Sequence, residues 1–177
     1  MRRFLNFVYD AAGYLAACFI FAIFAVMIGG TIMRELGLKT GGQDEIVAWF
    51  CAASAFLAMA HTFRYGDFVR VTLLLEQLGP RLGRAAELGS LAIASAFVGY
   101  LAFWAARFAF ESWQFNDIAN GMIPIPLWIP QSSFVVGALL LFLAVVDELI
   151  VVLRGGRPTY VIAAEDRRAR GDFSEEI

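Results

Sequence analysis

The chain has 177 residues, of which 60% are hydrophobic, and its formal net charge at pH 7 is −2. Soluble domains contain roughly 45–50% apolar residues, and one compact domain of this length cannot hide so much apolar surface from water. The composition therefore favours a membrane protein. The small net charge and the absence of a basic groove give no indication of nucleic-acid binding.

Four apolar segments are long enough to cross a membrane, since a helix needs about 20 apolar residues to span the hydrocarbon core. We expect transmembrane helices at about 11–33, 46–63, 88–106 and 129–153. Pro130 fits the first turn of the last helix, where a missing N–H breaks no helical hydrogen bond. The sequence predicts an all-α integral membrane protein with one membrane domain over 1–158 and a polar cytoplasmic tail over 159–177.

The first apolar segment differs from a cleaved signal peptide. Its run from Ala11 to Gly30 is longer than the hydrophobic region of such a peptide, which has roughly 7–15 residues. No A-x-A-like cleavage site follows the run, so we expect an uncleaved membrane helix. Cys18 and Cys51 lie inside apolar runs, where cysteine is typically a small buried hydrophobe, and no disulfide framework is predicted.

The basic residues predict the orientation of the spans. The N-terminus, the 64–84 loop and the C-terminal tail together carry 11 Lys and Arg residues, whereas the opposite side carries 3. Because cytoplasmic loops hold the excess of basic residues, we expect both termini and the 64–84 loop in the cytoplasm. The 34–45 and 108–128 loops then face outward.

The segment between the second and third spans has a helical apolar face. Val71, Leu74, Leu75, Leu78 and Leu82 recur with helical spacing, although Gly79-Pro80 interrupts the run. We expect an amphipathic interfacial helix at about 67–84, lying on the cytoplasmic side with its arginines toward lipid headgroups. Either it only bridges two spans, or it docks along a partner membrane subunit. The candidate contact residues are Arg64, Asp67, Arg70, Leu74, Leu78 and Arg81.

Three short motifs resemble one family of transporter subunits. They are Arg64-x-Gly66-Asp67-Phe68-Val69-Arg70-Val71 after an alanine-rich span, Trp128-Ile129-Pro130 entering the last span, and Gly156-Arg157-Pro158 behind it. Together with the four-span plan, over roughly residues 5 to 158, they resemble the small membrane subunit (DctQ type) of tripartite ATP-independent periplasmic (TRAP) transporters. Members often have His where Asp67 stands and an acid where Thr72 stands, so no role that depends on those residues is carried over.

The resemblance implies a non-catalytic scaffold subunit of an ion-coupled uptake transporter in the bacterial inner membrane. In that family a large multi-span permease subunit carries the solute and sodium sites, and a periplasmic solute-binding protein delivers the solute. The small subunit packs against the permease and contributes to the docking surface outside. Organic acids are the family's usual solutes. The alternative that we keep is a self-sufficient small four-helix exporter acting as a homo-oligomer.

Four acids on the predicted outer side are candidates for docking the binding protein: Asp44, Glu45, Glu111 and Asp117. Asp44 and Glu45 also suit the N-terminus of the second helix, because acids offset the helix dipole there. The 108–128 loop is rich in acids, amides and tryptophans, with Pro124 and Pro126 near its exit. Its tryptophans alternatively only anchor the chain in the headgroups.

Chemistry-bearing motifs are scarce. The single histidine, His61, cannot assemble a metal site alone, and no phosphate-binding loop, G-x-S-x-G or H-E-x-x-H occurs. We therefore expect no enzyme activity, no cofactor and no metal. Asp147 and Glu148 lie near the inner end of the last span. They are interpreted as an acidic patch facing Arg154 or a partner's base, with a proton or sodium relay as the less favoured hypothesis.

Two ion pairs are predicted from helical spacing alone. Arg107 and Glu111 are spaced i, i+4 at the outer mouth of the third span, and Arg84 and Glu87 are spaced i, i+3 at its inner mouth.

Overall fold

The computed structural model describes residues 2–38, 41–65, 79–156 and 158–162. Four long helices account for most of these residues: α1 (Arg2–Glu35), α2 (Gln43–Tyr65), α4 (Gly79–Gln114) and α5 (Trp128–Leu153). The only strand-like pairing among the described residues is an isolated bridge between Ile118 and Pro126. All four helices are long and apolar enough to cross a membrane, which confirms the prediction of an all-α integral membrane protein with four spans.

The helices extend beyond the predicted spans, most of all at the starts of α1 and α4. Gly79-Pro80 is expected from the sequence to interrupt an interfacial helix, but α4 begins at Gly79, and Pro80 lies in its first turn. A proline is tolerated there because the first N–H groups of a helix have no intrahelical partner. Residues 79–84 of the expected 67–84 interfacial helix are therefore the first turns of α4. The rest of that segment, 66–78, lies outside the described residues.

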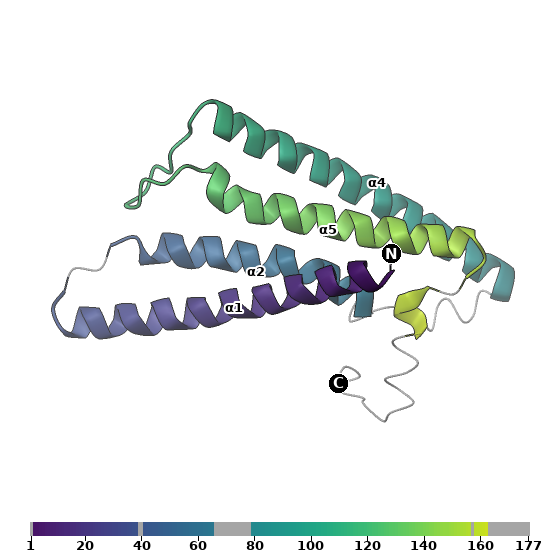
Figure 1. The fold of residues 1–177 in the computed structure, drawn as a ribbon, viewed down its shortest axis with the longest axis horizontal. Helices are drawn as coiled ribbons and strands as arrows, with labels where there is room; N and C mark the ends of the chain where they lie inside the picture. The colour runs from purple at the N-terminus through teal and green to yellow at the C-terminus, as the bar shows by residue number, and fades with distance from the viewer. Residues whose placement is uncertain (1, 39–40, 66–78, 157, 163–177) are drawn as a thin grey trace, which may run out of the picture.

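The helices pack in the order α1, α2, α5, α4, with the extensive contacts between successive members of this row (Figure 1). The central pair, α2 and α5, is joined closely because Gly137 of α5 lies against the backbone of Phe56. A Cβ atom built at Gly137 would be 2.5 Å from the Phe56 carbonyl oxygen. Small residues commonly permit such close approach between membrane helices. The rings of Phe56 and Phe134 meet beside this contact, with centroids 4.2 Å apart.

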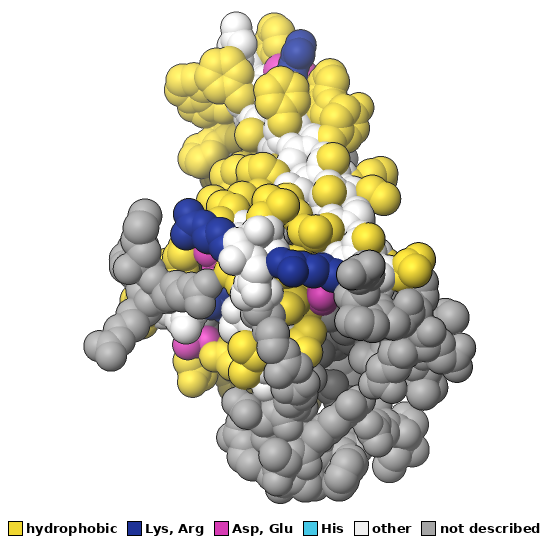
Figure 2. Space-filling view, turned by 90° about the vertical axis from the view of Figure 1, so that its right-hand side faces the viewer, with side chains coloured by type: hydrophobic (Ala, Val, Ile, Leu, Met, Phe, Trp, Pro, Cys, Tyr) yellow, Lys and Arg dark blue, Asp and Glu magenta, His cyan; other side chains and the backbone are white. Residues whose placement is uncertain are grey.

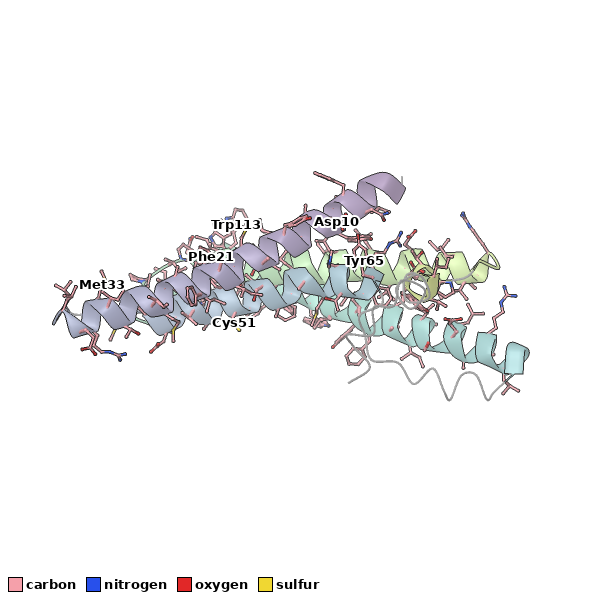
Figure 3. All side chains as sticks on the ribbon, turned by 90° about the horizontal axis from the view of Figure 1, so that it is seen from below. Asp10, Phe21, Met33, Cys51, Tyr65 and Trp113 are labelled. Atoms are coloured by element: carbon pink, nitrogen blue, oxygen red, sulfur yellow. The ribbon has the colours of Figure 1, made fainter. Side chains whose placement is uncertain are left out.

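The outer pair of helices, α1 and α4, is largely uncovered. Only 11% of the most apolar window of α1 is buried, against 33% for α5. Large apolar side chains stand exposed along both edges, including Phe21 of α1 (Figure 3) and Phe97 of α4. In a membrane these faces would meet either lipid or another protein.

The first and the last described residues of the chain lie at the same end of the row. The start of α1, the end of α2, the start of α4 and the end of α5 gather there (Figure 1). Residues 158–162 turn back against this end, and Tyr160 is buried with Leu91, Val145 and Val152. Tyr160 and Val161, which lie in the predicted tail, thus pack against the helices. Residues 163–177 lie outside the described part of the chain.

Candidate functional site

A cluster of charged and polar side chains lies within the shared end of the row, centred on Arg64. Arg64 stands in the last turn of α2 and is only 6% exposed. Its Nη1 donates to Glu148 Oε1 at 2.8 Å and to Asp147 Oδ2 at 3.1 Å, and its Nη2 donates to Asn6 Oδ1 at 3.1 Å. We call Arg64, Asn6, Asp147 and Glu148 the Arg64 cluster; it joins α1, α2 and α5.

Glu148 is the most deeply buried member of the Arg64 cluster, with no exposed surface. Its second oxygen, Oε2, accepts a hydrogen bond from the backbone N–H of Thr159 at 2.8 Å. Both carboxylate oxygens therefore have donors, which is the condition under which a buried ion pair is tolerated. Through Glu148 the cluster also holds residues 158–162 against the helices.

The sequence interpretation placed the partner of Asp147 and Glu148 at Arg154 or on another protein, and the structure instead pairs both acids with Arg64. Arg64 is 83 residues before Asp147, so no helical spacing relates them. The sequence nevertheless contained a feature that could have predicted the pairing of Arg64 with these acids. In a four-span protein α2 and α5 run in the same direction, so charges near the ends of both helices lie at the same membrane depth.

A second polar group lies beside the Arg64 cluster, between α1 and α2. Tyr65 Oη donates to Asp10 Oδ1 at 2.8 Å, and both residues stand at this end of the row (Figure 3). His61 Nδ1 lies 3.6 Å from the same Asp10 oxygen, which is a close approach of charges only when the histidine is protonated. The described residues contain no group of three or more potential metal ligands.

The two ion pairs predicted from spacing have different outcomes. Arg107 Nε lies 2.9 Å from Glu111 Oε1 on the exposed surface of α4, which confirms that pair. The predicted Arg84–Glu87 pair is wrong, because each of the two side chains forms a hydrogen bond with another group. Glu87 Oε1 accepts a hydrogen bond from Tyr160 Oη at 3.0 Å, and Arg84 Nη2 donates to the Val152 carbonyl at 3.4 Å.

At the opposite end of the row, Glu45 joins the first turn of α2 to the loop between α4 and α5. Its Oε1 accepts the backbone N–H of Met122 at 2.7 Å, and its Oε2 accepts that of Ile123 at 3.3 Å. Gly121 lies directly against the carboxylate, where a Cβ atom would collide with it. The loop is closed on itself by a hydrogen bond from the Ala119 N–H to the Ile125 carbonyl.

The structure places the four candidate docking acids at this end of the row with unequal exposure. Asp44 and Asp117 are exposed, and Glu111 is half-exposed in its pair with Arg107. The carboxylate of Glu45 accepts hydrogen bonds from the loop between α4 and α5. Among the candidate subunit contacts, Arg64 has the intramolecular partners described above. Asp67, Arg70, Leu74 and Leu78 lie outside the described residues, as does the side chain of Arg81.

One family model accounts for most of the chain. The model for the DctQ component of tripartite ATP-independent periplasmic transporters matches residues 23–155, which include the C-terminal part of α1 and all of the chain from α2 to the end of α5. A search of the curated proteins finds no match. The matched segment covers more than half of the chain and contains Arg64 with both of its acidic partners. The chain therefore belongs to the DctQ family, the small membrane components of TRAP transporters.

Proposed function

We propose that this chain is a non-catalytic scaffold subunit of a binding-protein-dependent, ion-coupled uptake transporter of the bacterial inner membrane. It packs against the large permease subunit and helps to dock the periplasmic binding protein. Besides family membership, the proposal is supported by the arrangement of the helices in a single row with two uncovered edges. Its edges, α1 and α4, expose large apolar side chains along their length, which suits an element laid against a larger membrane protein.

The distribution of charge supports a scaffold rather than a transport pathway. Residues 11–33, 46–60, 88–106 and 129–146 contain no Asp, Glu, Lys or Arg. Transporters generally bind solute and ions near the bilayer midplane, with polar groups from several spans. In the Arg64 cluster both Nη atoms of Arg64 and both oxygens of Glu148 already have partners. Solute and sodium therefore bind to the other membrane subunit, and the alternative of a self-sufficient exporter is not favoured.

Assembly with the permease tests the proposal directly. The tagged chain, expressed with the large permease subunit encoded beside it, should copurify with that subunit. A Leu74→Asp/Leu78→Asp variant should copurify less well, because it introduces charges into the predicted apolar face of the 67–84 segment. Each charge costs up to roughly 3 kcal/mol near the bilayer midplane and less at the interface. A Gln77→Asp variant, off that face, is the matched control. Failure of the wild-type chain to bind any permease would contradict the scaffold role.

The orientation with both termini in the cytoplasm is part of the same proposal and rests on the basic-residue count. In a background without Cys18 and Cys51, a cysteine at Asn120 or Thr40 should react with an impermeant thiol reagent added to intact spheroplasts. A cysteine at Gln77 or Ser174 should react only after lysis. The reverse labelling pattern would overturn the orientation and, with it, the proposed docking face.

A further inference from the structure

A small cavity of about 330 Å³ opens at the end of the row where α1 begins and α5 ends. Arg84 and Glu87 of α4 line one side, and Val152, Gly155 and Gly156 at the end of α5 line the other, with Val161 beside them. None of these residues belongs to the Arg64 cluster. Figure 2 looks onto this end and shows basic side chains beside acidic ones, with hydrophobic side chains behind them.

The end of α5 is built in a way that leaves this cavity open. Gly155 has φ of +85°, and its N–H bonds to the Val152 carbonyl while the Gly156 N–H bonds to the Val151 carbonyl. This pair of bonds is the Schellman motif, in which glycine takes the left-handed position. A Cβ atom at Gly155 would lie 3.3 Å from Arg84 Nη2. A side chain at Gly155 would therefore contact the guanidinium, and glycine leaves that space free.

Arg84 and Glu87 present opposite charges to the cavity without neutralising each other. They stand three residues apart on α4, yet no ion pair joins these two described side chains. The Tyr160 hydroxyl holds Glu87 Oε1 at 3.0 Å, and the only bond of Arg84 within the described chain is the long one, 3.4 Å, to the Val152 carbonyl. Within the described chain, no other bond engages the remaining donors of Arg84 or the second oxygen of Glu87, and these groups suit a ligand that carries both a negative and a positive group.

The cavity lies at the depth of lipid headgroups. A span of about 20 residues crosses the hydrocarbon core, and counted from Phe134, the first apolar residue after Ser132-Ser133, such a span ends at Leu153. Val152 and Arg84 are therefore at the boundary between hydrocarbon and headgroups. Two apolar residues of the lining, Val152 and Val161, also belong to or pack against the buried cluster around Tyr160.

We propose that this cavity binds the headgroup of a zwitterionic aminophospholipid. The Arg84 guanidinium binds the phosphate, since guanidinium groups bind phosphate by paired, charge-assisted hydrogen bonds. The Glu87 carboxylate accepts hydrogen bonds from the primary ammonium group. An anionic headgroup would meet the same guanidinium but also the repulsion of Glu87, and a trimethylammonium headgroup has no N–H to donate. The geometry points to phosphatidylethanolamine over phosphatidylglycerol and phosphatidylcholine.

Native mass spectrometry tests this preference on the full chain, extracted in mild detergent with whatever subunits accompany it and then delipidated. Phosphatidylethanolamine, phosphatidylglycerol and phosphatidylcholine with identical acyl chains are titrated separately, and lipid adducts are counted. We expect one site that prefers phosphatidylethanolamine. Arg84→Gln should weaken it about tenfold, the effect of losing a hydrogen bond to a charged group. Glu87→Gln, which can still accept from Tyr160, should weaken phosphatidylethanolamine binding to the level of phosphatidylglycerol.

Arg154→Gln is the matched control, because Arg154 is exposed just beyond α5 and does not line the cavity. It should leave phosphatidylethanolamine binding unchanged. Equal losses in Arg84→Gln and Arg154→Gln would overturn the proposal in favour of general attraction to a basic surface. So would equal binding of the three lipids by the wild-type chain. Displacement of the lipid by free phosphoethanolamine at comparable concentration would show that a soluble ligand, and not a membrane lipid, is recognised.

Discussion

The two ends of the helix row are held together by different chemistry. At the end where α1 begins and α5 ends, a buried ion pair joins α2 to α5, with Arg64 bonded to Glu148 at 2.8 Å and almost no contact with solvent, and Arg64 also bonds to Asn6 of α1. At the opposite end a single carboxylate, Glu45, accepts backbone N–H groups of a loop whose side chains are largely exposed. A buried pair is strongly destabilised when one partner is lost, whereas an exposed contact can be replaced by water.

The two ends therefore differ in what their side chains do: those at one end hold helices together, and those at the other remain at the surface. The Arg64 cluster fixes how α1, α2 and α5 sit relative to one another and ties residues 158–162 to them. The loop end keeps its acids available at the surface, since Asp44 and Asp117 are exposed. The following predictions test that contrast.

The largest effect is expected at Glu148. A Glu148→Ala variant leaves Arg64 buried beside a single, partly exposed carboxylate, and removing one partner of a buried pair typically destabilises by about 3–5 kcal/mol. The free energy of unfolding can be measured in mixed micelles by the loss of helical circular dichroism with increasing SDS. Asp147→Ala, at a side chain that is 24% exposed, should have a clearly smaller effect.

A double variant sharpens the same experiment. Arg64→Met/Glu148→Leu removes both charges, so it should be less destabilised than Glu148→Ala alone, because replacing a buried pair by apolar residues of similar size is often close to neutral. If Glu148→Ala and Asp147→Ala unfold at the same SDS concentration, the buried pair does not hold this end of the row together.

A moderate, local effect is expected at Glu45. Glu45→Gln replaces a carboxylate that accepts two backbone N–H groups by an amide with one acceptor oxygen, which should weaken the contact by about 1 kcal/mol. Hydrogen exchange at the Met122 and Ile123 amides should become several-fold faster, while global stability changes little. The adjacent Asp44→Asn is the control and should leave those amides unchanged. Equal acceleration in both variants would mean that local charge, not the Glu45 contact, protects the loop.

The smallest effect on the chain itself, and the one most specific to docking, is expected at Asp117. Asp117→Lys reverses an exposed charge, and charges at the rim of an interface act mainly on encounter rate and partner choice. Uptake by the assembled transporter should fall most at low ionic strength and low binding-protein concentration, with stability and assembly unchanged. Uptake equal to wild type at every binding-protein concentration would place the docking face wholly on the permease.

Properties that depend on local sequence were predictable here. Apolar runs of about 20 residues identify spans whatever their neighbours, so the four helices, the all-α class and the Arg107–Glu111 pair within one helix were all foreseen. The motifs around Arg64, Trp128 and Gly156 were sufficient to identify the family. The predictions of side-chain partners were wrong where both a local and a distant partner were possible. Glu87, for example, bonds to Tyr160, 73 residues away, and not to Arg84.

By itself, then, the sequence determined that this is a four-span member of the DctQ family, because hydropathy and helix formation are local properties of the chain. Only the tertiary structure decided the order of the helices in the row, the burial of Tyr160 beyond the last span, and the partners of Arg64 and Glu45. Those contacts join residues up to 84 positions apart. Each depends on how side chains on different helices fit together and on which buried charges find partners there, and neither is encoded in any single stretch of sequence.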